Sequence, residues 1–200
     1  MRYEPDYKAK TRQKVLAEAA KTLRSEGLQG MGVASVMGKA GLTHGAFYAH
    51  FESKDDLVAE TIKAMILGAR GKFDAVTADL APADALRAYV EFYLSARHRD
   101  NTLTSCPLPW VANDIPRLGE ASAKRYGASI AGLTELLATR LRALSHPQAD
   151  AAASSVVAEL VGALTLARAV EDRAQSDALL ASSRASILAR LGLAADAAKA

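Results

Sequence analysis

The sequence predicts an all-α protein, with a short three-helix part at the N-terminus and a longer helical bundle after it. Ala, Leu, Arg and Glu recur through segments of helical length, which favours helix over strand. From residue 15 onward, apolar residues repeat at three-and-four spacing, the pattern of amphipathic helices. No alternating, β-rich stretch stands out, so the prediction contains no sheet.

Composition bounds the class of protein. The 200 residues are 50% hydrophobic and 24% charged, which allows a sizeable core in one compact domain or in two small ones. The formal net charge is only +3, but residues 1–51 hold eight Lys and Arg against four acids, and the remainder holds 17 against 18. This N-terminal surplus is what a phosphate-binding surface requires, although ordinary surface charge is an alternative explanation.

The chain shows no targeting segment. Its opening, Met1–Lys8, is polar where a signal peptide needs an apolar run, and no stretch reaches the roughly 18 uninterrupted apolar residues of a membrane span. The single cysteine, Cys106, excludes an intrachain disulfide and fits a reducing compartment. We therefore expect a cytoplasmic protein without a membrane partner.

Three helices are expected before residue 52. The first lies between Lys8 and Glu26 and ends at Gly27, and the second extends from Val33 to a turn at Gly41. In the third, Thr43 is expected to cap a helix from His44 to Phe51. Two short helices joined by a glycine-containing turn form a helix-turn-helix.

The third helix has the chemistry of a segment that enters a DNA groove. Phe47 and Phe51 would form one ridge on the first two helices, while Gly45 and Ala49 would lie opposite and let the backbone approach base edges. Tyr48 is long enough to reach a phosphate, and histidines and helix N-terminal N–H groups donate to anions. The alternative is a helical bundle in which this turn is fortuitous.

A fourth helix is expected from about residue 53 to about residue 75. Ser53 and Asp56 form a capping-box variant with Asp in place of the usual Glu. Lys54 lies in the first turn, where the helix dipole disfavours a cation. An anionic partner would explain this lysine, and a solvated surface charge is the alternative. The buried stripe of this helix is expected to be Leu57, Val58, Ile62, Met65, Ile66 and Ala69.

The run Gly41-Leu-Thr-His-Gly-Ala-Phe-Tyr-Ala-His-Phe-Glu-Ser-Lys-Asp-Asp-Leu57 resembles the DNA-binding signature of TetR/AcrR-type transcriptional repressors, and Thr11–Ala20 extends the match. The resemblance implies a DNA-binding domain over 1–52 and a ligand-binding and dimerising domain over 53–200. It also implies release from a double-stranded operator when a ligand binds. Carried over by position, the phosphate contacts are Thr43, Tyr48, His50 and Lys54, and the residues at base edges are His44, Gly45 and Ala46. Gly32, Ser35 and Lys39 complete the expected DNA-binding set, although Gly32 stands where many members have Thr.

The C-terminal part reads as further helices. One begins at Pro82 and ends near Arg99, and the proline-containing segment Asp100–Trp110 follows it. Three more are indicated by Ile130 to Leu141, Val156 to Ala167 and Leu179 to Leu191. The last two helices are the expected homodimer surface, since two-fold operators need two reading heads; packing within one chain is the alternative.

Two signal inputs remain open. Cys106-Pro-Leu resembles a subset of the family in which this cysteine senses electrophiles or oxidants. The basic residues Arg97, His98 and Arg99 are near in sequence and could lower its pKa; an inert buried thiol is the alternative. The other input is a small-molecule inducer in an apolar pocket. The expected ligand or sensor residues are Tyr89, Phe92, Tyr93, Cys106, Trp110 and Tyr126.

Other functions have little support in the sequence. Pairing Cys106 with His98 or His146 would make a thiol nucleophile and base, but no spacing supports an enzyme. One thiol and four scattered histidines give no metal-ligand signature, and no motif indicates a cofactor. A DNA-binding regulator without small-molecule control is the main rival function.

Overall fold

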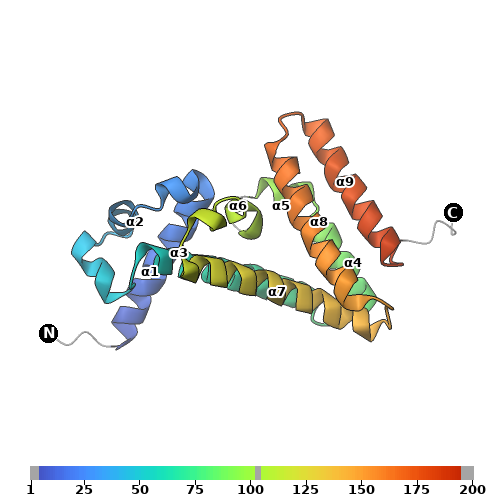
Figure 1. The fold of residues 1–200 in the computed structure, drawn as a ribbon, viewed down its shortest axis with the longest axis horizontal. Helices are drawn as coiled ribbons and strands as arrows, with labels where there is room; N and C mark the ends of the chain where they lie inside the picture. Colours follow the sequence, from blue (N-terminus) through green and yellow to red (C-terminus); the bar gives the residue numbers. More distant parts are fainter. Residues whose placement is uncertain (1–4, 102–104, 195–200) are drawn as a thin grey trace. The chain divides into compact units, whose positions relative to one another are not determined.

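The computed structural model describes residues 5–101 and 105–194, and within these ranges every regular element is a helix (Figure 1). The expected all-α fold is confirmed. The elements in chain order are α1 (Pro5–Glu26), the 3-10 helix η1 (Gly27–Gly30), α2 (Val33–Lys39), the 3-10 helix η2 (His44–Ala49), α3 (Lys54–Thr77), α4 (Pro82–Tyr93), α5 (Ala96–Asp100), α6 (Leu108–Val111), the 3-10 helix η3 (Ile115–Arg117), α7 (Glu120–Ala143), α8 (Ala149–Ala169) and α9 (Arg173–Arg190).

By their internal contacts, the residues form two compact units. The N-terminal unit comprises Met1–Ala69 and Cys106–Ser129, and the C-terminal unit comprises Arg70–Ser105 and Ile130–Ala200. The part of α3 up to Ala69 and the segment Cys106–Ser129 thus pack with the helix-turn-helix. The predicted domains, DNA binding over 1–52 and ligand binding and dimerisation over 53–200, stay a prediction.

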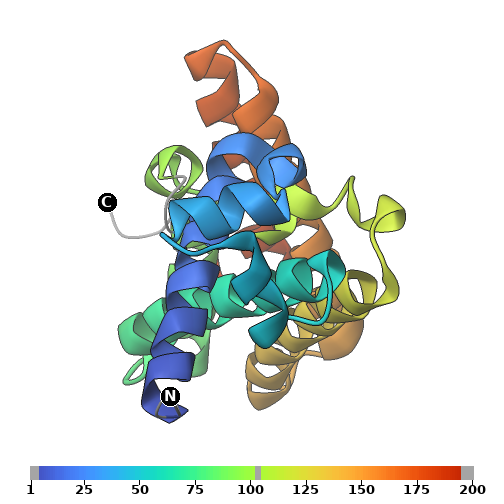
Figure 2. The ribbon, with the colours of Figure 1, turned by 90° about the vertical axis from the view of Figure 1, so that its left-hand side faces the viewer.

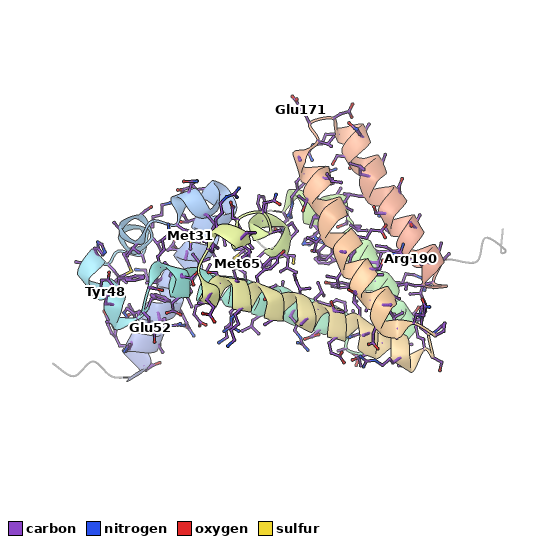
Figure 3. All side chains as sticks on the ribbon, in the orientation of Figure 1. Met31, Tyr48, Glu52, Met65, Glu171 and Arg190 are labelled. Carbon is purple, nitrogen blue, oxygen red and sulfur yellow. The ribbon has the colours of Figure 1, made fainter. Side chains whose placement is uncertain are left out.

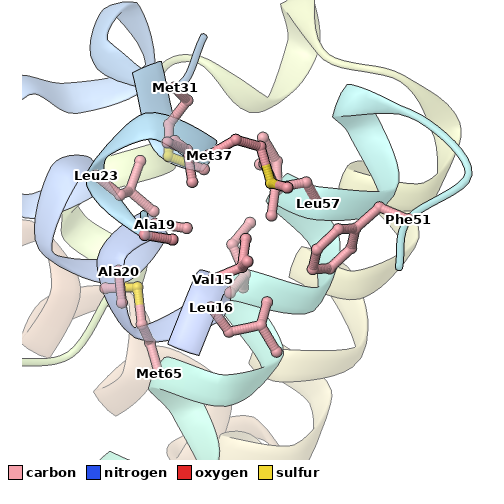
Figure 4. Packing of buried hydrophobic residues seen from close by; sticks show 14 of the residues in the cluster. Val15, Leu16, Ala19, Ala20, Leu23, Met31, Met37, Phe51, Leu57 and Met65 are labelled. Atoms are coloured by element: carbon pink, nitrogen blue, oxygen red, sulfur yellow. The ribbon is translucent and has the colours of Figure 1, made fainter. Parts of the chain in front are cut away.

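One hydrophobic cluster holds the N-terminal unit together (Figure 4). Val15 of α1, Met37 of α2, Leu57 of α3 and Phe51, which precedes α3, converge in it, and all four are buried. Val111 of α6 is wholly buried in the same cluster, and Trp110 and Tyr126 pack against it. Because α6 and α7 supply part of this core, the unit is built from two separate stretches of chain.

Two glycines end helices as expected. Gly27 follows α1 with φ +63°, and Gly41 follows α2 with φ +69°. This left-handed conformation costs a residue with a Cβ about 1–2 kcal/mol. Both positions explain why the first two helices stop where the sequence indicates.

Asp55 links α3 to the start of α7. Its carboxylate accepts hydrogen bonds from the backbone N–H groups of Gly119 at 3.1 Å, Ala121 at 2.9 Å and Ser122 at 3.4 Å, and from the Ser122 hydroxyl. A carboxylate at a helix N-terminus satisfies amides that have no partner within the helix. The partners lie more than sixty residues apart in sequence, so no local pattern predicts this cap.

The prediction of one continuous helix from Pro82 to near Arg99 is wrong, because the structure has two helices there. α4 ends at Tyr93, and the separate short helix α5 begins at Ala96. Ser95 between them has φ −96° and ψ 150°, and its hydroxyl accepts a hydrogen bond from the His98 backbone N–H at 3.0 Å. A serine N-cap therefore restarts the helix where periodicity alone indicated continuation.

The proline-containing segment also differs from expectation. Pro107 and Pro109 were expected to exclude regular helix, yet α6 forms one helical turn with Pro109 near its start. Proline is tolerated there because the first amides of a helix have no partner within it. Residues 102–104 of this segment lie outside the described ranges.

The C-terminal unit is organised around α8 and α9, which lie side by side (Figure 1). Val156, Leu160 and Leu164 of α8 are buried, as are Leu180 and Ile187 of α9. These helices match the predicted ones, whereas α7 begins at Glu120, ten residues before Ile130. By length and composition alone, α8 is also apolar enough to cross a membrane, a property that the core helix of a globular protein shares.

Candidate nucleic-acid interface

The segment expected to enter the groove is η2, and its two sides differ as predicted. Phe47 is 1% and Phe51 2% exposed, and their rings stack with centroids 5.6 Å apart. His44, Gly45 and Ala49 are exposed, and Tyr48, labelled in Figure 3, is 72% exposed. Burial of the phenylalanines fixes the segment to the core and leaves its polar side open for a partner.

The geometry of η2 corrects two details. It is a 3-10 helix and not the α-helix that the 100° periodicity assumed. Thr43 lies at its N-cap with φ −77° and ψ 153°, but its side chain makes no capping hydrogen bond, so the expected cap is wrong. The Thr43 side chain is exposed, which leaves its hydroxyl available to another acceptor.

α2 carries the other expected DNA-binding residues. Gly32 is its N-cap without a side-chain hydrogen bond, and Ser35 is exposed. Lys39 is exposed as well, but its ammonium pairs with Glu26 and lies 3.3 Å from the Thr22 hydroxyl. Contact with a phosphate would therefore require Lys39 to exchange a carboxylate partner for the nucleic acid.

His50 lies among positive charges. Its pKa is lowered by burial and by the nearby Lys8 and Arg12, and its Nδ1 is buried without a hydrogen-bond partner in the described part of the chain. The start of α1 and the end of η2 thus combine into a positive region, which favours an anion. In the sequence, Lys8 and Arg12 stand out by their charge alone, and only the fold brings α1 beside this segment (Figure 2).

Lys54 opens α3 as expected and is exposed. Ser53 caps this helix, since its hydroxyl accepts from the Asp56 N–H at 3.0 Å and the Asp56 carboxylate accepts from the Glu52 N–H at 3.1 Å. The predicted capping-box variant is thereby confirmed, with the return bond shifted by one residue. The cap fixes the backbone from which Lys54 projects.

The six expected ligand or sensor residues divide between the units. Tyr89 and Tyr93 are buried in the C-terminal unit, while Phe92 is 47% exposed and stacks on His98. Cys106, Trp110 and Tyr126 belong to the N-terminal unit. Burial, and secondarily the charge of the Cys106 thiolate, raises the pKa of Tyr126. The set is therefore two separate groups, one in each unit.

The basic residues expected to activate Cys106 have other roles. The Arg99 guanidinium donates to Asp177 at 2.6 Å and to Asp100 at 2.9 Å. Burial lowers the pKa of His98 to about 4, and its Nδ1 lies 2.8 Å from the Tyr93 carbonyl oxygen. His98 is neutral at physiological pH and so supplies no charge that would favour a thiolate. In the described residues, no group of three His, Cys, Asp or Glu side chains could hold a metal ion.

The fold and the exposed side of η2 define a class of structure: an all-helical protein with an N-terminal helix-turn-helix. Residues 15–61 match the family model described as "Bacterial regulatory proteins, tetR family". This stretch, which runs from Val15 of α1 through α2 and η2 to the start of α3, is similar to the proteins of that family.

Solved structures share the fold over most of their length. The reduced form of NemR from E. coli is 19% identical with a TM-score of 0.77, covering 89% of this chain and 95% of that one. A TetR-family regulator from Cytophaga hutchinsonii is 24% identical with a TM-score of 0.77, covering 92% and 96%. One from Agrobacterium tumefaciens is 23% identical with a TM-score of 0.75, covering 92% and 98%. A comparison with curated protein sequences finds no match.

Proposed function

We propose that this chain is a cytoplasmic transcriptional repressor that binds a two-fold operator as a homodimer and leaves it when an inducer arrives. The observation that carries the DNA-binding part is the segment of residues 44–51, in which Phe47 and Phe51 are buried while His44 and Tyr48 are exposed. Lys8 beside His50 adds positive charge at the end of this segment, where Arg12 also lies and pairs with Glu60. Phosphates bind such a surface, and small residues such as Gly45 allow close approach to base edges.

Tyr48→Phe tests this surface because it removes one hydroxyl and leaves the ring. We expect weaker binding to operator and random duplex alike, with the salt slope lower by up to about one unit. Tyr126→Phe is the matched control: its hydroxyl donates to the Leu108 carbonyl at 3.4 Å within the same unit. Unchanged Tyr48→Phe binding across several salt concentrations would contradict a phosphate contact.

For the homodimer, α8 and α9 are the proposed surface. Leu166 of α8 is 57% exposed and lies on a helix rich in apolar residues, so it can contribute apolar area to a contact with a second copy. Leu166→Glu should yield monomers in light scattering and lose most operator binding, because a two-fold site needs both reading heads. Leu80→Glu, at a residue that is 42% exposed outside these helices, is the control.

For the inducer, we retain two candidates. Cys106 is 7% exposed, and a neighbour in fold was solved in a reduced form, which is compatible with thiol chemistry in such a scaffold. If Cys106 is the sensor, Cys106→Ser should abolish release from DNA by quinones, aldehydes and hypochlorite. If instead an apolar ligand binds, aromatic compounds or fatty acyl derivatives should raise the melting temperature of the variant and the parent equally.

We call residues 44–51 the recognition segment. Release from the operator would follow if the signal moves α3 and changes the separation of the two recognition segments in the homodimer. These must match half-sites about 34–36 Å apart or another fixed operator spacing. Simultaneous binding of inducer and operator without antagonism would contradict this coupling. It would favour the rival function, a DNA-binding regulator without small-molecule control.

A further inference from the structure

A side chain of α1 holds the end of the recognition segment. Arg12 Nε donates to the His50 carbonyl oxygen at 3.4 Å, and its guanidinium carbon lies 4.9 Å from the centre of the Phe51 ring. Arg12 Nη2 also donates to the Glu60 carboxylate of α3 at 2.9 Å. One guanidinium therefore joins α1, the last residues of the recognition segment and α3.

The recognition segment needs such support at this end. Its first six residues form the 3-10 helix η2, a geometry with weaker hydrogen bonds than the α-helix, and Thr43 provides no side-chain cap at its start. Phe47 and Phe51 anchor its inner side by burial. Burial of two rings fixes the inner side of the segment, and a hydrogen bond to a backbone carbonyl also fixes its end.

Glu60 fixes the guanidinium in turn. Its side chain is 18% exposed, and besides Arg12 it accepts from Arg125 of α7 at 3.5 Å and lies 3.8 Å from the Lys63 ammonium. A carboxylate with three cationic neighbours is held in one place. Arg12 is 33% exposed, so its orientation depends on this partner and on the Phe51 face.

We propose that Arg12 is a positioning residue: it sets the orientation of the recognition segment through the His50 carbonyl and the Phe51 ring, and Glu60 holds it in that role. The inference rests on the proposed function, because positioning matters for a segment that reads DNA. It differs from a phosphate contact, which would add affinity for any duplex and no discrimination between sequences. A planar guanidinium can stack on a ring while donating in two directions, and an ammonium cannot reproduce that arrangement.

Arg12→Lys separates the two roles, because it keeps the positive charge and loses the planar fork. Hydrogen exchange of the unliganded protein is the first measurement. We expect the amides of residues 44–51 to exchange about fivefold faster or more, as loss of one stacking contact and one hydrogen bond predicts. Exchange in 173–190 should stay unchanged. Lys10→Gln is the control on the same helix, because Lys10 is exposed and pairs only with Asp6 among the ion pairs described.

Binding to DNA is the second measurement. In Arg12→Lys, the ratio of operator affinity to random-duplex affinity should fall about fivefold or more, while random-duplex affinity and the salt slope stay as in the parent. Glu60→Gln should change the ratio and the exchange in the same direction by a smaller factor. This variant keeps the shape of the side chain and loses its charge.

Unchanged exchange at 44–51 in both variants would overturn the proposal. So would an equal loss on operator and random duplex with a salt slope lower by about one, because that is the signature of a lost phosphate contact. If the parent protein prefers no duplex from its own genome, the proposed function fails, and the exchange measurement still decides whether Arg12 holds the segment.

Discussion

Arg12 in the N-terminal unit and Arg99 in the C-terminal unit both join several elements, but they do so at different depths. Arg12 keeps 33% of its side chain exposed at the edge of an apolar core, whereas Arg99 keeps only 5%. Arg99 binds Asp100, Ser176 and Asp177, and its backbone carbonyl accepts from Arg168 at 3.2 Å.

Apolar side chains fill the core of both units, and the two arginines show how the polar links differ. In the N-terminal unit, the polar side chains lie at the edge of the core, beside the recognition segment. In the C-terminal unit, buried charge ties α5 to the junction of α8 and α9. Removing a polar group should therefore affect DNA binding in the first unit and folding in the second.

The largest expected effect is in the apolar core of the N-terminal unit. Phe47→Ala should lower the free energy of unfolding by about 3–5 kcal/mol, the range for removing a buried aromatic ring, and should abolish DNA binding. Tyr48→Ala, one residue further and 72% exposed, should change stability by less than about 1 kcal/mol. Urea unfolding of both variants checks the contrast. Equal losses would mean that the two sides of η2 are not distinct.

The second effect is a dependence on pH in the C-terminal unit. The pKa of His98 is about 4 in the folded protein, below its ordinary value of about 6.5, because burial disfavours the charged ring. The unfolded chain binds the proton first, so stability should fall as the pH drops from about 6.5 to about 4, by about 2–3 kcal/mol in all. Unfolding curves across this range measure the slope. In His98→Asn this part of the slope should disappear, and a slope that persists would assign it to other groups.

The third effect is the loss of stability on removing the buried guanidinium of Arg99. Arg99→Met should cost about 2 kcal/mol, less than a fully buried pair, because Asp100 is 47% and Asp177 59% exposed and water can solvate both carboxylates. Arg142 is the matched control, since it also bridges two carboxylates, Glu135 and Asp150, but is itself 47% exposed. Arg142→Met should leave the unfolding midpoint unchanged. A comparable loss of stability in Arg142→Met would contradict the conclusion that burial of the guanidinium decides its contribution to stability.

The smallest effect concerns two glycines of α7, one in each unit. A Cβ added at Gly127 or at Gly132 would meet no atom within 4 Å. Replacing either with Ala should therefore raise stability by about 0.5–1 kcal/mol, the cost of glycine in a helix interior. Gly41→Ala, at φ +69°, should lower it. Thermal unfolding measures all three, and a loss at Gly132 alone would point to packing against a partner.

Much of the N-terminal unit could be predicted from the sequence, because its signals are local. Gly27 and Gly41 end helices in a conformation that favours glycine, and Ser53 caps α3 within four residues. The inner side of η2 followed from the spacing of Phe47 and Phe51. Its 3-10 geometry did not, since the same spacing also fits an α-helix.

Other features depend on partners distant in sequence. The bond from Arg99 to Ser176 joins residues 77 apart, and no periodicity indicates it. Similarly, Arg12 gave no signal beyond its charge, because the His50 carbonyl and Glu60 become its neighbours only after folding. The end of α4 was missed for another reason: Ser95 reads as an ordinary polar residue unless the following backbone is known to turn.

The hydrogen bonds from the start of α7 to Asp55 have a practical consequence for protein engineers. A chimera that grafts residues 1–69 onto a foreign effector scaffold would leave the Asp55 carboxylate with no helix to cap and would omit Val111 from the core. Exchange of DNA specificity between such regulators should thus succeed when Cys106–Ser129 is transferred together with residues 1–69. The unit to transfer is therefore made of two separate stretches of sequence.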